Sequence, residues 1–233
     1  MPYMRRYNKQ SAAYTGIPAS SHLKRSYKRA TKYATMDNAK KALDLAIKTK
    51  KLLNVEYKFI DKFANNAAVV NTPTLISLPL ITQGVTDVQR VGNSIRLTRY
   101  TLNYILKIST AATNSMVRIM VVWDSQPNSA DLPASLLLEQ TASTTNIVSP
   151  YKIDSKRRIF VLYDKVHVLT PNGANKGVAR HINIPMDRHI RYDGNSGTVG
   201  DLASGNLILV HMGDEGVNFP SLTHFSRIRF IDN

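Results

Sequence analysis

Basic residues and tyrosines are interleaved through the first 36 residues of the chain, which we call the basic arm. Its bases are Arg5, Arg6, Lys9, Lys24, Arg25, Lys28, Arg29 and Lys32, and it contains no acidic residue. Lys and Arg contact phosphates and release the counterions condensed on a nucleic acid. Five of the eleven tyrosines also lie here, among them Tyr7, Tyr27 and Tyr33, and such rings can stack on unpaired bases. The composition predicts a flexible segment that contacts single-stranded nucleic acid.

A second basic segment follows at residues 37–53. Asp37 is a suitable N-cap, and the segment continues with good helix formers among several lysines, including Lys40 and Lys41. The pattern predicts a short basic helix that adds to the nucleic-acid contact. An anionic membrane is the alternative partner for such a helix, but its apolar face lacks Trp and Phe, so a membrane is disfavoured.

The net charge of +15 is concentrated at the N-terminal end. Thirteen bases and two acids precede residue 52, which leaves +4 for the other 182 residues. A charge of this size and sign indicates an acidic polymer as partner. The chain has no cysteine, which excludes disulfides and Cys-based zinc sites and fits assembly in the cytosol or nucleus. Apolar runs are short, so we expect neither a secretion signal nor a membrane span.

Residues 54–233 have the texture of an antiparallel β domain. Short runs rich in β-branched and aromatic residues are bounded by Gly, Pro, Asn and Asp. Two long loops are expected, at Ser125–Pro150 and Arg188–Gly205, both free to form contacts and outer surface. We expect the aromatic side chains of this domain to be buried. The predicted fold is an all-β, eight-stranded jelly roll of two packed sheets, with strands near Val55–Asp61, Leu75–Thr82, Ser94–Ser109, Met116–Asp124, Arg158–Thr170, Val178–Pro185, Asn206–Met212 and His224–Ile231.

Three stretches of this domain resemble the capsid proteins of small circular single-stranded DNA viruses, the circovirus-like group. The first is Gly84–Leu106, with Arg90, Gly92 and Asn93 in its turn. The second ends a strand with Trp123 and Asp124, followed by Gln126, Pro127 and Asn128. The third follows Tyr151 and contains Phe160, Leu162 and Asp164. The three occur in the family's order across about half of the chain.

The resemblance implies a viral coat protein that assembles with itself into a small icosahedral (T=1) shell of sixty copies. It implies basic arms inside the shell that package circular single-stranded DNA, with assembly in the host nucleus, host import factors and a cell-surface receptor as further partners. It also implies that the motif residues of the three stretches are structural.

Two alternatives stay open on the sequence alone. Coat proteins of small RNA or satellite viruses have the same general plan. A cellular module that binds single-stranded nucleic acid with one face of a β sandwich is less favoured, because the β domain carries only +4 and its aromatics are expected inside.

The sequence favours no enzyme, cofactor or metal. The six histidines form no His-Glu-x-x-His pair, and those in strands alternate with apolar residues as hydrogen-bonded core histidines do. Residues 193–201 lack the acid spacing of a calcium loop, and no Gly-x-Ser-x-Gly elbow is present. A calcium ion held across a subunit interface stays open as an alternative, with candidate ligands Asp187, Asp193, Asp201, Asp214, Glu215 and Asp232.

Overall fold

The computed structural model describes residues 35–49, 57–142, 144–171 and 176–232, and the chain divides into two units between residues 54 and 55. In the first unit, residues 35–49 are helical and every side chain is exposed. Residues 35 and 36 already belong to the helix, so the prediction that Asp37 is its N-cap is wrong. No described helix is long and apolar enough to cross a membrane.

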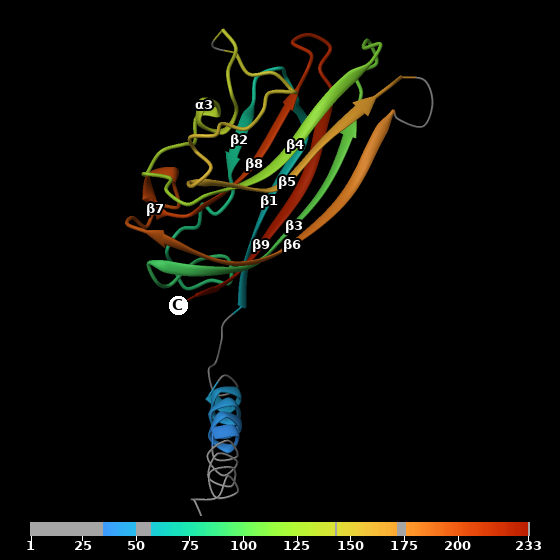
Figure 1. The fold of residues 1–233 in the computed structure, drawn as a ribbon. Coiled ribbons are helices and arrows are strands. Elements are labelled where there is room, and N and C mark those ends of the chain that lie inside the picture. The colour runs from blue at the N-terminus through green and yellow to red at the C-terminus, as the bar shows by residue number, and fades with distance from the viewer. Residues whose placement is uncertain (1–34, 50–56, 143, 172–175, 233) are drawn as a thin grey trace, which may run out of the picture. The chain divides into compact units, whose positions relative to one another are not determined.

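The second unit is built from two antiparallel sheets that face each other (Figure 1). In the described part of the chain, one sheet has five strands in the order β1-β9-β3-β6-β7 and the other has four in the order β2-β8-β4-β5. The first consists of β1 (Tyr57–Ala68), β9 (Ser221–Asp232), β3 (Ser94–Lys107), β6 (Gly177–Tyr192) and β7 (Leu202–Ser204). The second consists of β2 (Thr74–Ser77), β8 (Asn206–Gly213), β4 (Ser115–Asp124) and β5 (Ile159–Leu169).

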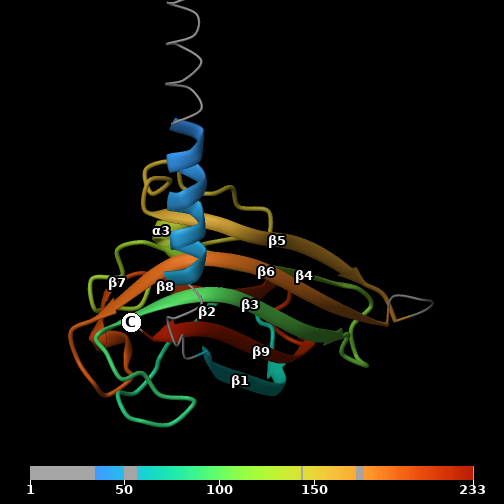
Figure 2. The same cartoon turned by 90° about the horizontal axis from the view of Figure 1, so that it is seen from below.

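This strand order confirms the predicted jelly roll. From β1 to β4 consecutive strands alternate between the sheets, β4 pairs with β5 and β6 with β7 within one sheet, and the first long strand pairs with the last. In Figure 2, β6, β3, β9 and β1 lie side by side across one sheet. All eight predicted strands are present, and β7 is an addition preceded by a short 3-10 helix, Val199–Asp201.

Alternating side chains of both sheets form the main core. Ile95, Leu97, Leu102 and Leu106 of β3 are fully buried between the sheets, together with the inward-facing residues of β4 and β8. Because successive residues of a strand point to opposite faces, the intervening β3 residues point away from the core. The burial pattern of β3 shows this alternation along most of its length.

Irregularities in strand pairing explain why some predicted strand ends were wrong. β6 continues to Tyr192 although Pro185 lies within it. Pro185 pairs with Arg99 next to a register shift, where Met186 and Asp187 of β6 lie opposite only Thr98 of β3, and such a bulge is one of the few positions in a sheet that tolerates proline. β1 similarly runs past a register shift between Ala64 and Ala67 and ends at Ala68.

The predicted loop after β4 is not free surface but a second layer over one sheet. It contains α3 (Ala134–Leu137), and its Leu132, Leu137 and Leu138 are buried against Met120 and Val122 of β4 and the outward residues of β8. Figure 1 shows α3 beside β2 and β8. β4 is therefore almost entirely buried on both faces, whereas one face of the other sheet is not covered by any described segment of the second unit.

Three histidines lie in the interior, and two of them differ from the expected hydrogen-bonded core histidines. His167 Nε2 lies 2.8 Å from the Tyr104 hydroxyl. Among the described residues, neither ring nitrogen of buried His224 has a hydrogen-bond partner, and His211 Nδ1 also lacks one. Burial lowers the pKa of His211 to about 4, and the charge of His224 adds to the shift. Burial likewise lowers the pKa of His224 and of His167.

Mild acid should therefore destabilise the fold. In the unfolded chain, histidine takes up a proton near pH 6.5, whereas buried His211 stays neutral down to about pH 4. As the pH falls through this window, the unfolded state binds the extra proton, and the free energy of unfolding drops by about 3 kcal/mol from His211 alone. Urea unfolding from pH 7 to pH 4 measures this loss. His211→Gln should flatten the pH dependence, whereas Val210→Ala should lower stability equally at every pH.

Candidate nucleic-acid interface

Most of the predicted nucleic-acid contacts lie outside the described residues. These are the predicted residues of the basic arm: Arg5, Arg6, Tyr7, Lys9, Lys24, Arg25, Tyr27, Lys28, Arg29, Lys32 and Tyr33. Lys40 and Lys41 are described, and both are exposed on the helix. Residues 35–49 contain three lysines and two aspartates, so the described helix has little net charge of its own. The positive charge of this end of the chain is therefore concentrated in the arm.

Arg90 lies inside the fold, where it holds three segments together. Its side chain is fully buried and donates hydrogen bonds to the carbonyl oxygens of Ile81, Gly92 and Gly194, with the Gly92 contact at 2.6 Å. Its guanidinium also lies 4.2 Å from the centre of the Tyr192 ring. In the same turn, the exposed Asn93 accepts a hydrogen bond from the Tyr192 amide through its carbonyl oxygen. Arg90 is therefore inaccessible to a nucleic acid and acts as a clamp on the fold.

Asp124 plays a similar part at the end of β4. It is fully buried and accepts two hydrogen bonds of 2.7 Å from Arg158, one at each carboxylate oxygen. Oδ1 also accepts the Gln126 amide, which closes the turn that continues through buried Pro127 and through Asn128 at a φ of 53°. This is the geometry of an Asx turn.

Trp123 is buried next to this turn. A Cβ at Gly205, where φ is 77°, would lie 2.8 Å from the Trp123 ring, so the backbone approaches the ring closely. The Arg188 guanidinium lies 5.6 Å from the Trp123 ring and 5.1 Å from the ring of Phe160, which is partly exposed on β5. Leu162, on the same strand, packs against the main core.

Asp164 links the loop that follows β4, which packs over the four-stranded sheet, to β4 and β5. Both of its carboxylate oxygens accept hydrogen bonds from Arg118, at 2.9 and 2.7 Å, and Oδ2 also accepts the Tyr151 hydroxyl. Arg118 in turn donates to the carbonyl oxygens of Ile147 and Ser149. Despite burial, which acts in the opposite direction, these hydrogen bonds and the charge of Arg118 lower the pKa of Asp164.

The uncovered face of the β1-β9-β3-β6 sheet carries residues that sequence reasoning missed. We call it the outer face, and it includes Phe59, Phe63, Arg99, Asn103, His181, Phe225, Arg227 and Arg229. The expectation that the aromatics are buried is wrong here, since Phe63 is 65% exposed and Phe225 is 38% exposed. The alternation of β9 was a usable signal, because Phe225 shares its face with Arg227 and Arg229.

The acidic residues suggested for calcium are separated in the described chain. Asp187 pairs with Arg96, Asp193 with Arg191 and Asp232 with Lys58. Asp201 accepts the Thr198 amide, and Asp214 accepts the Met116 amide. Within the residues that the structure describes, no three His, Asp or Glu side chains gather closely enough to hold a metal ion.

Comparison with solved structures returns structures of viruses. Tobacco necrosis virus has 14% identity and a TM-score of 0.35, with 77% of this chain and 96% of that chain covered. Cocksfoot mottle virus has 11% identity and a TM-score of 0.38, with 77% and 95% covered. Desmodium yellow mottle tymovirus has 10% identity and a TM-score of 0.36, with 76% and 81% covered. No curated protein matches the sequence. Because all three TM-scores are below 0.5, the family is assigned from the sequence match alone.

The resemblance to circovirus-like capsid proteins is wrong. The family model that matches is described as "Satellite tobacco necrosis virus coat protein", and it covers residues 23–233, which include all three stretches on which the resemblance was based. Circular single-stranded DNA as cargo, assembly in the nucleus and nuclear import factors depended on that resemblance and are not supported. The alternative of a small RNA or satellite virus coat is the one favoured. The chain belongs to the satellite tobacco necrosis virus coat protein family.

Proposed function

We propose that this coat protein assembles with copies of itself into a small closed icosahedral shell and packages single-stranded RNA through its basic arm. Its role is structural rather than enzymatic. The observation that carries the proposal is the family match over residues 23–233, and the RNA viruses of that family supply the class of cargo.

The distribution of charge supports the role of the arm. Residues 1–51 carry thirteen bases and two acids, whereas the rest of the chain has a net charge of only +4. If about sixty copies close a shell, their first 51 residues bring on the order of 660 positive charges into one cavity. Many weak phosphate contacts at high local concentration then retain a long polyanion, without sequence preference. The tyrosines between the bases favour single strands, because only unpaired bases offer a free face for stacking.

The described domain has the properties of a shell wall. Two packed sheets, a clamp at Arg90 and ion pairs at Asp124 and Asp164 fix the positions of the loops that leave the sheets. Rigid, repeated edges and loops of this kind can form the same contacts in every copy under point-group symmetry.

The test is electron microscopy of the purified protein, followed by nuclease treatment, extraction of protected nucleic acid and digestion with RNase or DNase. We expect small uniform shells that contain RNase-sensitive, DNase-resistant material. Shells with DNase-sensitive cargo would contradict the RNA assignment but not the coat function. A dispersed monomer under all assembly conditions would contradict the coat function itself.

A further inference from the structure

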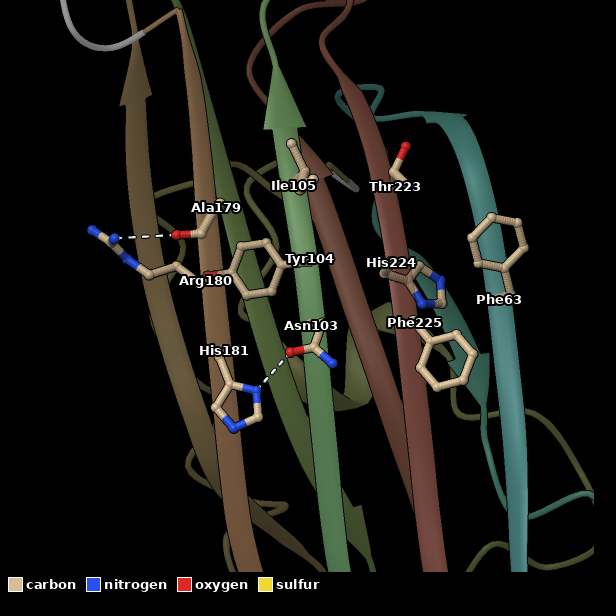
Figure 3. Close-up of a pocket in the computed structure, with 10 residues that line it drawn as sticks. All are labelled: Phe63, Asn103, Tyr104, Ile105, Ala179, Arg180, His181, Thr223, His224 and Phe225. Atoms are coloured by element: carbon tan, nitrogen blue, oxygen red, sulfur yellow. Dashed lines mark hydrogen bonds between the residues drawn. The ribbon is translucent and has the colours of Figure 1, made fainter.

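The outer face of the β1-β9-β3-β6 sheet is hollowed at its centre. A depression of about 520 Å³ opens between Phe63 of β1, Phe225 of β9 and His181 of β6 (Figure 3). A smaller one of about 170 Å³ adjoins it and is bordered by Arg227 and Arg229. Asn103 and Phe225 border both depressions, so the two form one continuous surface across four strands.

Aromatic and polar groups form a row across this face. The strand register places Phe63 opposite Phe225, Phe225 opposite Asn103, and Asn103 opposite His181. Asn103 Oδ1 and His181 Nδ1 are 2.6 Å apart. Figure 3 marks this hydrogen bond with a dashed line. Phe59 is a further aromatic of the face and is 37% exposed. Exposed phenylalanine side chains on directly opposite residues of neighbouring strands mark a binding surface rather than ordinary solvated sheet.

The arginines of the same face form a second row. Arg99 of β3 lies directly opposite Arg229 of β9, and neither forms an ion pair with any other described residue. Arg227 is paired with Asp61 at 2.7 Å, and its guanidinium lies 4.6 Å from the centre of the Phe59 ring. Like charges directly opposite each other destabilise a sheet unless a counter-charge binds. This arrangement therefore favours an anionic occupant.

We propose that the outer face is a second contact surface for single-stranded RNA, in addition to the basic arm. Bases stack on Phe63 and Phe225, and the backbone phosphates lie against Arg99 and Arg229. The proposal rests on the packaging function proposed above and names a site for it in the β domain. Aromatic platforms next to arginines are the combination by which proteins hold single strands without reading their sequence.

Charge complementarity selects RNA over a second copy of the chain as the occupant. Every copy carries +15, and the acids of this face are already engaged, Asp61 by Arg227 and Asp187 by Arg96. RNA supplies phosphates for Arg99 and Arg229, which have no acidic partner among the described residues. It also supplies planar bases that can stack on the exposed rings. Duplex RNA would satisfy only the arginines, because its bases are stacked on each other.

The experiment measures binding of a fluorescent oligouridylate to the full-length chain as a function of salt. Phe63→Leu/Phe225→Leu keeps apolar side chains but removes the rings, and we expect affinity to fall about tenfold, with affinity for duplex RNA unchanged. Arg99→Gln/Arg229→Gln should reduce the slope of log affinity against log salt by about 1.4, or about 0.7 for each lost phosphate contact.

Matched controls lie off this face. Phe219 is 42% exposed in the loop before β9, and Phe219→Leu should leave affinity unchanged. Lys156 and Arg157 are exposed before β5, and Lys156→Gln/Arg157→Gln removes the same charge as the arginine pair but should not change the slope. Coincident thermal unfolding curves establish that each variant is folded.

The outcomes separate this proposal from the packaging function. If the variants of this face bind RNA like the parent while neutralising the arm abolishes binding, the second surface is wrong and packaging through the arm stands. If the phenylalanine variant loses shell formation with unchanged RNA affinity, the face is an interface between copies and the proposal is overturned. If neither arm nor face variants alter RNA binding, the proposed packaging function also fails.

Discussion

Replacing Arg5, Arg6, Lys24, Arg25, Lys28 and Arg29 with Gln is expected to weaken single-stranded RNA binding about a thousandfold at physiological salt. Each lost phosphate contact removes about 0.7 from the slope of log affinity against log salt, so six should reduce the slope by about 4. Nuclease-protected RNA per particle should fall in parallel, because the cavity loses more than half of its positive charge. Binding is measured by fluorescence anisotropy across a salt series, and cargo by extraction after nuclease treatment.

A charge-preserving exchange is the control for this prediction. Converting each of the six positions from Arg to Lys or from Lys to Arg keeps the point charges and should keep the slope. If the Gln variant retains the slope of the parent chain, the assignment of the arm as the main phosphate contact is wrong. If both variants lose RNA equally, the arm recognises RNA through guanidinium or ammonium geometry rather than through charge.

Arg90→Met is expected to cost about 3 to 5 kcal/mol of folding free energy. The methionine side chain can follow the path of the arginine stem, but the carbonyl oxygens of Ile81, Gly92 and Gly194 lose their donor inside the protein. Buried acceptors left without a partner cost about 1 to 3 kcal/mol each, reduced where water can enter. The loss of folding free energy is measured from the shift in the urea midpoint, provided that the slope of unfolding free energy against urea concentration is unchanged.

Arg96→Met is the matched control, on the adjacent strand β3. Its ion pair with Asp187 is exposed on both sides, so the urea midpoint should change little. A midpoint for Arg90→Met that coincides with that of Arg96→Met would show that the clamp contributes nothing to stability. It would also remove the structural role that the geometry gives to the Arg90 turn.

Much of the fold could be predicted because the alternation of side chains is visible along the strands. All eight predicted strands exist, and β3 shows its core face clearly in Ile95, Leu97 and Leu102. The ends were less predictable. Pro185 looked like a strand end, and only the bulge next to it in the pairing of β6 with β3, a tertiary feature, makes continuation possible. β7 is three residues long, too short for a periodic signal.

The candidate site could be predicted where it depends on amino-acid composition. It could not be predicted where it depends on which face of a sheet the rest of the chain leaves exposed. Charge density identified the arm without any structure. Alternation along β9 could have placed Phe225, Arg227 and Arg229 on one face, but it could not tell whether another layer covers that face. Arg90 shows the converse: an arginine beside Gly and Asn in a turn suggests surface, whereas three carbonyl oxygens and the Tyr192 ring hold it inside.

The two sheets differ in mechanical support. The β2-β8-β4-β5 sheet has the main core on one side and the α3 layer on the other, so β4 cannot bend without displacing packed side chains from both. Described residues of the β domain back the β1-β9-β3-β6 sheet on one side only. When subunits deform to close a curved shell, or when a particle swells, the elastic strain will therefore concentrate in the singly backed sheet. A ligand bound to that sheet would stiffen it, and would do so in every subunit of the shell.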